Sequence, residues 1–422
     1  MLAKHLMSRS VIGRSVDQRH RESRLMVACI ILLFGCKFVV AVEPGIDSQQ
    51  SSRRRVPVSL TSASANSGLD SLGAHEIGCQ AAKNWQPSAA LRQRAQTILR
   101  QYRDDCEKKR QAANAMACFL QLQASHQQDI GAGTAMRAYY SRIAISLQQE
   151  LIAVGQQMVD DQSKKQDQLL KQGIAAALDL TSLQRQRIDL QDSGVQAAAQ
   201  DEQLRNTLYA LTDIDYDSCQ CLVEPLTIIS SELDCQCLVH FAMRNRRDLY
   251  AWQYLCSQVN EDSAPMFVSL LVTSITGYGI PVPITVGLKK WLCSCGDQSN
   301  LAESMRQELS TVIRGNQSWI EETVLTKCSE LRLAYQRLEL EHQRMASWRQ
   351  RLDQLQRLEA LGQTKPDELA AAQAGYLRSQ TDEVKRRLDA KLAEVALSET
   401  VGGLSIRCCQ CQPWLITGVE GY

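Results

Sequence analysis

Residues 324–355 read VLTKCSELRLAYQRLELEHQRMASWRQRLDQL, and an apolar side chain returns in them every seven residues. The members of this series are Val324, Leu331, Leu338, Met345 and Leu352. Trp348 and Leu355 lie on the neighbouring seam. A seven-residue period held over four heptads is typical of helices that pack side by side, with the side chains of one inserted between those of the other. We therefore predict a long coiled-coil helix here.

The same period occurs earlier in the chain, in two interleaved series. Their members are Tyr140, Leu147 and Val154, and Ala144, Leu151 and Met158. The pattern predicts a helix from about Ala135 to Gln172, which at roughly 1.5 Å per residue is about 55 Å long. We expect helix breaks on either side of it, at Gly131–Gly133 and at Gly173. A rod of this length does not fit a compact globule.

An offset of 189 residues superposes the two helical regions without a gap for about 80 residues. It places Gly173 on Gly362. Within seven residues each glycine is followed by an acidic residue and Leu, with Asp179 in the first copy and Glu368 in the second. A glycine that ends one helix and an acidic residue that opens the next are typical of a tight helical turn, and Pro366 suits a first helical turn. Two coiled coils could align by chance, but the matched turns favour a true duplication.

The predicted fold is therefore all-α, with two tandem long antiparallel helical-hairpin repeats of the coiled-coil or α-barrel type and at most one short β-hairpin. The predicted organisation is a signal peptide or lipoprotein signal at 1–36, a flexible linker at 37–78, the first helical repeat at 79–215, a connector with the start of the second repeat at 216–265, an apolar Gly/Pro segment at 266–298, the second helical repeat at 299–403 and a Cys-rich tail at 404–422.

The apolar segment contains the candidate β-hairpin. Met266–Ile275 and Ile280–Leu288 flank Thr276–Gly279, and the later run alternates apolar with other residues as a half-buried strand does. Pro281 and Pro283 argue against a strand, because each removes a donor from the hydrogen-bond ladder. The other interpretation is a loop that packs in the interior or at an interface.

Charge and composition argue against one class of partner. The chain has 47 basic and 46 acidic residues, a formal charge of +1, and its body has no long basic block that could follow a phosphate backbone. We therefore expect no nucleic-acid partner.

The first residues read as an export signal. A basic stretch is followed by Leu25–Cys36, which holds no charge and is shorter than the roughly 20 residues that span a bilayer. The run ends Leu33-Phe34-Gly35-Cys36 and resembles a bacterial lipobox, which would make Cys36 the lipidated N-terminus of a membrane-anchored protein. An ordinary signal peptide cut near Ala41 and an uncleaved anchor that continues to Val42 are the alternatives.

Sixteen cysteines are many for an exported protein, and several stand in close pairs. Cys219 and Cys221 form one Cys-Gln-Cys pair, and Cys235 and Cys237 form another. Four thiolates at this spacing could bind a metal ion tetrahedrally, and in an oxidising compartment they could form disulfides that fix the connector between the repeats. Unpaired structural thiols are the third interpretation.

Nothing in the sequence predicts an enzyme or a cofactor. The sequence has no nucleophile elbow, phosphate loop, dinucleotide fingerprint or zinc-protease motif. Its six His are scattered, and no two of them are four residues apart. We expect a non-enzymatic protein that uses no cofactor.

The order of these features resembles the TolC family of outer-membrane efflux proteins, over about residues 90–403. The residues that carry the resemblance are Ala138–Tyr140, Gly173, Leu178–Leu180, Leu183, Arg185, Leu190 and Leu204–Thr212 in the first copy, and Arg246–Leu249, Arg351–Leu352, Gly362, Pro366–Leu369 and Leu392–Leu397 in the second. Arg246-Arg247-Asp248-Leu249 is similar to the Arg-Pro-Asp-Leu stretch that commonly opens a family repeat, with Arg247 in place of the Pro.

The resemblance implies an envelope protein of the outer membrane, on its periplasmic side. It implies a homotrimer whose helices form a conduit for efflux, in contact with a periplasmic adaptor and an inner-membrane pump. The gate would lie where the turns at Gly173 and Gly362, with Asp179 and Glu368, gather the helix ends.

One part of the family pattern is missing from the sequence. Family members insert two β-strands into each repeat, whereas Asp104–Ser141 reads as helix with a single Gly-Ala-Gly break and offers no strand pair. A second interpretation is therefore a non-conducting periplasmic coiled-coil scaffold lipoprotein derived from the same repeat.

Overall fold

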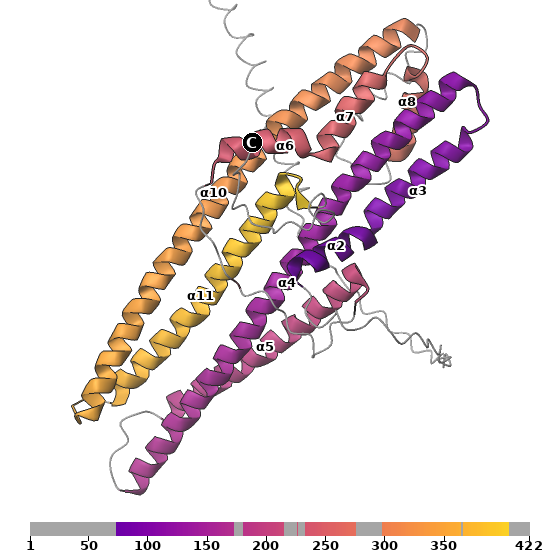
Figure 1. Cartoon of the computed structure of the whole chain (residues 1–422). Helices are drawn as coiled ribbons and strands as arrows, with labels where there is room; N and C mark the ends of the chain where they lie inside the picture. The colour runs from indigo at the N-terminus through magenta and orange to yellow at the C-terminus, as the bar shows by residue number, and fades with distance from the viewer. Residues whose placement is uncertain are drawn as a thin grey trace, which may run out of the picture. The chain divides into compact units, whose positions relative to one another are not determined.

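The computed structural model of the chain describes residues 73–172, 180–214, 226, 233–275, 298–363 and 366–404. All of them belong to one compact unit, Ala65–Tyr422, and the other unit, Met1–Ser64, lies outside the described residues. Within the described ranges every regular element is an α-helix, as predicted (Figure 1). The predicted signal segment with Cys36, and most of the predicted linker, lie outside these ranges.

The two tandem helical hairpins predicted from the sequence are confirmed. The first repeat contains α2 (Ala74–Asn84), α3 (Gln86–Gln101), α4 (Glu107–Lys171) and α5 (Leu180–Thr212). The second repeat contains α6 (Cys235–Asn245), α7 (Arg247–Gln258), α8 (Ala264–Ile275), α10 (Gln298–Ala360) and α11 (Pro366–Thr400). The offset of 189 places Lys171 on Ala360, and these are the last residues of α4 and α10. The duplication thus extends to the ends of the helices.

Each repeat opens with two short helices joined by a single residue, which the sequence analysis did not predict. Trp85 joins α2 to α3 with φ −62° and ψ 108°, and Arg246 joins α6 to α7 with φ −67° and ψ 116°. These extended conformations turn the chain sharply between the two helices. The helical body therefore begins at Ala74, inside the segment predicted to be a linker.

The predicted helix break at Gly131–Gly133 is wrong, because α4 runs through it without interruption. A Cβ on Gly131 would lie 2.8 Å from the Trp85 indole, and a Cβ on Gly133 would meet the Glu399 carboxylate of α11. The two glycines therefore make room for neighbouring side chains. Packing of the helix outweighs the roughly 1 kcal/mol that a glycine costs relative to Ala.

The first half of the predicted β-hairpin is also wrong, because Met266–Ile275 belongs to α8. Asn260 and Ser263 cap this helix reciprocally, since the Asn260 amide donates to Ser263 Oγ at 2.9 Å and the Ser263 amide donates to Asn260 Oδ1 at 2.8 Å. The side chains that it buries at helical spacing are Phe267, Leu270 and Leu271. A short apolar run fits a strand or a helix equally well, and here the cap and the burial favour the helix. The second half, Ile280–Leu288, lies outside the described residues.

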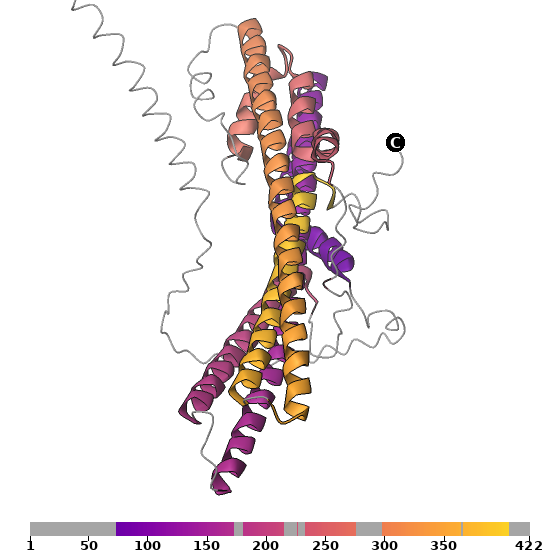
Figure 2. The ribbon, with the colours of Figure 1, turned by 90° about the vertical axis from the view of Figure 1, so that its left-hand side faces the viewer.

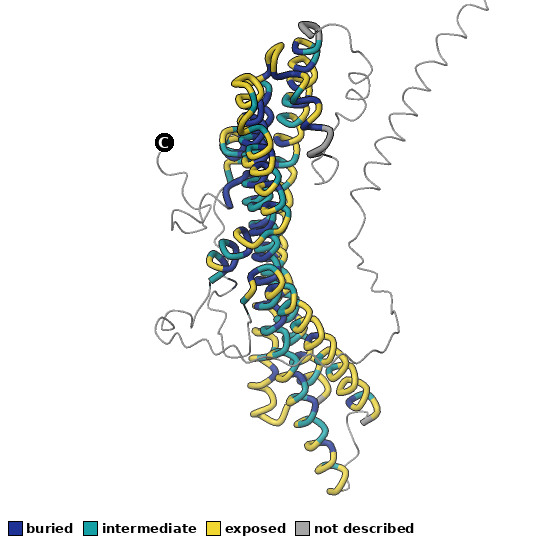
Figure 3. The backbone as a smooth tube through the Cα atoms, turned by 90° about the vertical axis from the view of Figure 1, so that its right-hand side faces the viewer, coloured by how far each residue is buried: buried dark blue, intermediate teal, exposed yellow. Residues whose placement is uncertain are grey.

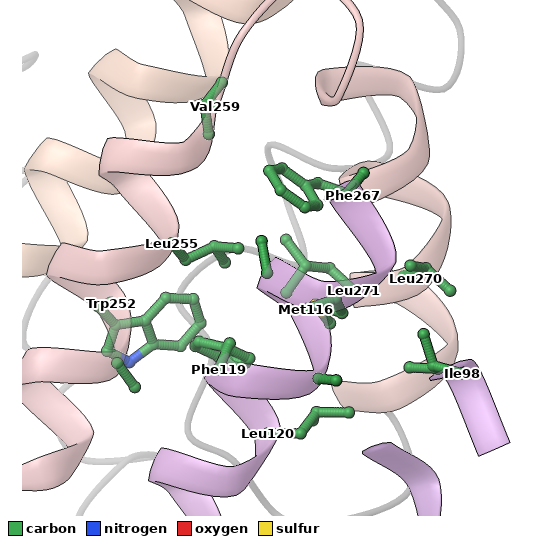
Figure 4. Packing of buried hydrophobic residues seen from close by; sticks show 14 of the residues in the cluster. Ile98, Met116, Phe119, Leu120, Trp252, Leu255, Val259, Phe267, Leu270 and Leu271 are labelled. Atoms are coloured by element: carbon green, nitrogen blue, oxygen red, sulfur yellow. The ribbon is translucent and has the colours of Figure 1, made fainter. Parts of the chain in front are cut away.

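A buried apolar cluster joins α3, α4, α7, α8 and α10 (Figure 4). Within it the Phe119 ring of α4 meets the Trp252 ring of α7 edge to face, with the ring centroids 4.8 Å apart. Burying a large apolar side chain fully stabilises the fold by roughly 1.5–3 kcal/mol. The cluster therefore fixes the long helix of the first repeat to the opening helices of the second.

The long helices lie side by side in the order α5, α4, α11, α10, because α5 packs along α4, α4 along α11 and α11 along α10 (Figure 1, Figure 2). Buried residues gather where the short helices also pack, and the free ends of the hairpins are mostly exposed (Figure 3). The helices α5 and α10 are thus the two edges of a layer. Across the described residues, no helix is both long and apolar enough to cross a membrane.

Candidate functional site

The outer side of α5 carries an exposed apolar stripe, which we call the α5 stripe. Its members are Ile188, Val195 and Tyr209, which lie at multiples of seven residues from one another, and Val195 is 69% exposed. The apolar side chains that α5 buries are Leu183, Ala197 and Leu208. The step of five residues from Leu183 to Ile188 turns about 140° around a helix. The stripe therefore faces away from the helices on which α5 packs, with the period of a coiled-coil seam.

A second stripe follows the outer side of α10, and we call it the α10 stripe. Its members are Leu333 and Leu340, and Leu340 is 61% exposed. Trp319 and Leu361 continue the same heptad register at the two ends of the stripe, where Arg246 lies over the Trp319 ring and Leu361 follows the last residue of α10. The buried residues Leu331 and Leu338 stand two positions earlier, about 200° around the helix. Both edges of the layer thus present a surface suited to another helix.

The duplication shows what these stripes correspond to inside the chain. The offset of 189 places Val195 on Val384, and Leu333 on Ala144. Val384 of α11 is only 8% exposed, and it belongs to the same buried cluster as Ala144 of α4. Leu340 falls on Leu151, which packs against that cluster. The surfaces left open at the edges are therefore equivalent to the surfaces that the two repeats use against each other.

The internal seam between α4 and α11 differs from the open edges of α5 and α10 at one pair of positions. Leu377 of α11 packs so closely on α4 that a Cβ on Gly155 would lie 2.9 Å from its Cδ2. The equivalent of Leu377 is Ile188 of the α5 stripe, whereas the equivalent of Gly155 is Arg344 on α10. A seam between the two edges would therefore be similar to the internal seam in register and different in detail.

The turn that follows α10 ends at a glycine, as predicted. Gly362 has φ +68°, a left-handed conformation that glycine adopts without strain. The Gln363 amide donates to the Leu358 carbonyl at 2.9 Å, and the Gly362 amide donates to the Glu359 carbonyl at 2.9 Å. This pair of bonds is a Schellman C-cap, which satisfies the last carbonyls of α10.

The other residues of the predicted gate are only partly placed. Glu368 is exposed in the first turn of α11, where a negative charge favours a helix N-terminus. Gly173 and Asp179 of the first repeat lie outside the described residues. Their function as a gate stays a prediction.

Arg246 and Asp248, which match the family's repeat-opening stretch, form a buried ion pair. Arg246 donates from Nε to Asp248 Oδ1 at 2.9 Å and from Nη2 to Oδ2 at 2.6 Å. Its Nη1 donates to the carbonyl of Thr400, the last residue of α11, at 3.2 Å. Its guanidinium lies 5.0 Å from the centre of the Trp319 ring. The opening of the second repeat is thus fixed to the end of that repeat.

The first repeat has an equivalent hydrogen bond, which is made by a different type of residue. Asn84, the last residue of α2, donates from Nδ2 to the carbonyl of Thr212 at 2.9 Å, and Thr212 is the last residue of α5. In both repeats a side chain from the opening helices therefore binds a free carbonyl at the C-terminus of the last helix.

His126 of α4 completes the group around Asp248, with its Nε2 3.9 Å from Asp248 Oδ2. Burial acts to raise the pKa of Asp248, but His126 and Arg246 outweigh it and hold that pKa below its ordinary value. Burial is the largest effect on the pKa of His126 and lowers it below its ordinary value. Asp248 acts in the opposite direction and raises that pKa, but by less. This group is an ion pair that holds helices together.

Two of the four cysteines of the predicted metal or disulfide site lie among the described residues. Cys235 and Cys237 are free thiols at the start of α6, and Cys219 and Cys221 lie outside the described residues. Among the residues that the structure describes, no three potential metal-ligating side chains come together. Cys79 of α2 is disulfide-bonded. A metal or disulfide site at the four connector cysteines stays a prediction.

The order and packing of these helices define the class of fold, which is that of the TolC-type outer-membrane channels. The resemblance inferred from the sequence is thereby confirmed at the level of the fold. The CmeC outer-membrane channel of Campylobacter jejuni superposes with a TM-score of 0.56 at 10% identity, over 78% of this chain and 85% of its own. The outer-membrane protein VceC of Vibrio cholerae superposes with a TM-score of 0.56 at 13% identity, over 78% and 96%. CusC, a protein that forms a transmembrane channel, superposes with a TM-score of 0.59 at 10% identity, over 78% and 92%.

Sequence comparison adds nothing to this likeness. No protein-family model matches the chain, and no curated protein sequence matches it. The structures that share the fold are described as channels and an outer-membrane protein, and the expectation of a non-enzymatic protein stays a prediction.

Proposed function

We propose that this chain is a TolC-like efflux component whose copies assemble edge to edge into a helical conduit at the outer membrane. In this assembly the α5 stripe of one copy packs on the α10 stripe of the next. The observation that carries the proposal is the equivalence of these stripes to the covered seam between α4 and α11. Because the contact joins two different surfaces, it repeats from copy to copy and closes into a ring when the rotation closes.

The energetics favour such a contact. Each Ile, Val, Leu or aromatic side chain that the seam buries contributes roughly 1.5–3 kcal/mol when its burial is complete. We propose three copies, as the resemblance implies, together with a periplasmic adaptor and an inner-membrane pump. The turns at Gly173 and Gly362 would then gather the helix ends and gate passive conduction.

Conductance and assembly test the proposal together. The detergent-purified protein should be a trimer by native mass spectrometry and should give discrete conductance steps in a planar bilayer. Val195→Glu places a charge in the seam and should abolish both. Gln200→Glu adds the same charge to the same helix about 140° away and should leave both unchanged. A wild-type monomer that does not conduct would contradict the proposal.

A non-conducting periplasmic scaffold lipoprotein is the second candidate function. The observation that favours it is the direct connection from α3 to α4, where residues 102–106 form a tight turn at a place where the resemblance predicts strands. A stable trimer without conductance would support the scaffold. Incorporation of radioactive palmitate into the wild type, and its loss in Cys36→Ser, would establish the lipid anchor.

A further inference from the structure

We propose that Cys235 and Cys328 form a disulfide that joins the start of α6 to α10 when the protein reaches an oxidising compartment. The sequence analysis grouped Cys235 with the other connector cysteines, whereas the fold brings it to a thiol 93 residues further along the chain. The proposal relies on the envelope location in the proposed function for its compartment alone, because the pairing follows from the fold.

The two cysteines lie at the same cluster of side chains, and Cys235 is close enough to raise the pKa of the Cys328 thiol. The Cys235 Sγ donates to the Leu233 carbonyl at 3.8 Å. Cys328 is 1% exposed within the apolar cluster that α6 and α7 form with α10 and α11, and Cys235 packs half-buried at the edge of that cluster. A reagent in solvent can therefore reach this pair of cysteines only at Cys235.

The backbone is fixed on both sides of this pair. Asp234 caps α6, because its Oδ1 accepts from the Gln236 and Cys237 amides at 3.0 Å each. Arg332, one helical turn after the buried thiol on α10, donates to the Leu233 carbonyl at 2.9 Å. These bonds hold the start of α6 against α10, so closing a covalent bond there needs no large movement of the chain.

The order of the oxidation steps follows from burial. Burial raises the pKa of the Cys328 thiol to about 12, and the neighbouring Cys235 adds to this. Cys328 therefore stays protonated and covered, and Cys235 is the thiol that meets the oxidant. The oxidant is a disulfide, either of a small thiol such as glutathione or of a thiol-exchange protein.

The thiol–disulfide exchange with the oxidant takes place in two steps. The Cys235 sulfur attacks one sulfur of the oxidant's disulfide, loses its proton to solvent and releases the first thiol. Cys328 then attacks the Cys235 sulfur, and its proton passes to the displaced thiolate, which leaves as the second thiol. Two protein thiols are oxidised by two electrons, and the disulfide of the oxidant is reduced to two thiols.

The new bond would close a long loop that contains α7 and α8. Cross-links over long loops restrict the unfolded chain most, so the oxidised protein should resist heat better than the reduced one. For a chain of this size we expect Tm to rise by several degrees.

The experiment maps the bond in the full-length protein. The reduced protein is incubated with oxidised glutathione, its remaining thiols are alkylated in denaturant, and peptides from a digest without reductant are identified by mass spectrometry. The expected product is a cross-linked peptide that contains Cys235 and Cys328, together with the rise in Tm. Cys235→Ser and Cys328→Ala should each abolish both, while Cys256→Ser, at another half-buried free thiol, should keep them.

Two results would overturn the pairing. One is alkylation of both thiols in a sample where Cys79 is protected by its own disulfide. The other is a cross-link from Cys235 to Cys219, Cys221 or Cys237. Native mass and conductance are measured on the same samples, so a disulfide in a non-conducting monomer would contradict the proposed function and leave this inference intact.

Discussion

His126 lies buried beside the ion pair of Arg246 and Asp248, and its burial gives the stability of the protein a dependence on pH. The pKa of His126 in the folded protein lies below 6.5, whereas the unfolded chain titrates at that ordinary value. Below it the unfolded state binds a proton that the folded state does not bind. The free energy of unfolding should therefore fall as the pH drops through 6.5, by at most about 1.4 kcal/mol per pH unit. Urea unfolding between about pH 8 and 5 measures this slope.

A variant separates this effect from other acid effects. His126→Leu removes the titrating group and should flatten the profile in this range. The lowered pKa of Asp248 acts in another window, because its contribution is present above 3.8 and is lost as the pH falls below that value. An equally steep profile in His126→Leu would refute this assignment.

Asp213 and Gly402 occupy equivalent positions after the last helix of each repeat, and both are left-handed. Asp213 has φ +58° and Gly402 has φ +71°. A Cβ on Gly402 would lie 3.0 Å from Arg246 Cγ and 3.2 Å from its Cα, so Gly402→Ala meets both backbone strain and a close contact. It should lower the free energy of unfolding by about 1–2 kcal/mol.

The reverse change serves as the control. Asp213→Gly relieves the left-handed conformation but adds freedom to the unfolded chain, and the two effects offset each other to within about 1 kcal/mol. Denaturant titrations of the two variants give the comparison. Equal losses of stability would show that the turn conformation is not the cause.

Two glycines inside long helices should respond in opposite directions to the same substitution. At Gly315 of α10 no atom lies within 4 Å of a new Cβ, so Gly315→Ala should raise the free energy of unfolding by about 1 kcal/mol. Gly131→Ala gains the same helix propensity, but its Cβ would lie 2.8 Å from the Trp85 ring. It should lower stability by about 1–3 kcal/mol. Thermal unfolding followed by circular dichroism measures both, and a gain at Gly131 would contradict the packing described here.

Elements whose causes are local could be predicted from the sequence. The long helices follow from the heptads, and the end of α10 follows from Gly362 and the acidic start of α11. The failures depend on distant residues. Gly131 reads as a break until Trp85 is known to lie over it, and the apolar run of α8 reads as a strand until its burial and its cap are known.

The candidate site was harder to predict for a similar reason. The offset of 189 pairs Leu333 with Ala144 and Leu340 with Leu151, so these two residues of the α10 stripe could be recognised from the repeat as members of a helical seam. A seam buried inside the chain and a seam left at an edge have the same seven-residue period. Only the order of the helices in the layer distinguishes them. The presence of Cys235 and Cys328 at one cluster likewise has no local signal in the sequence.

In the proposed assembly, Val195 of one copy should face Leu333 of the next, as Val384 shares a buried cluster with Ala144 inside the chain. Val195→Glu and Leu333→Lys should each break the trimer, because each leaves an unpaired charge in an apolar seam. The double variant should restore part of it, and high salt should weaken that rescue. Native mass spectrometry reports the copies per particle.

The control for this rescue keeps the charges and changes the place. Val195→Glu combined with Leu361→Lys puts the positive charge at the tip of the hairpin, too far along the helix to pair, and should not restore the trimer. Rescue by both combinations would mean that net charge, rather than the seam, governs assembly.

The two kinds of seam also differ in how they depend on the amount of protein. Inside the chain α4 and α11 meet at an effective concentration of roughly millimolar order, whereas in the proposed assembly α5 and α10 of different copies would meet only as often as mass action allows. This difference agrees with the larger side chain at the open edge, where Leu333 stands at the position that Ala144 fills inside. Dilution should therefore separate the copies at their edges and leave each pair of hairpins closed, which makes the pair of hairpins the unit that exchanges between assemblies.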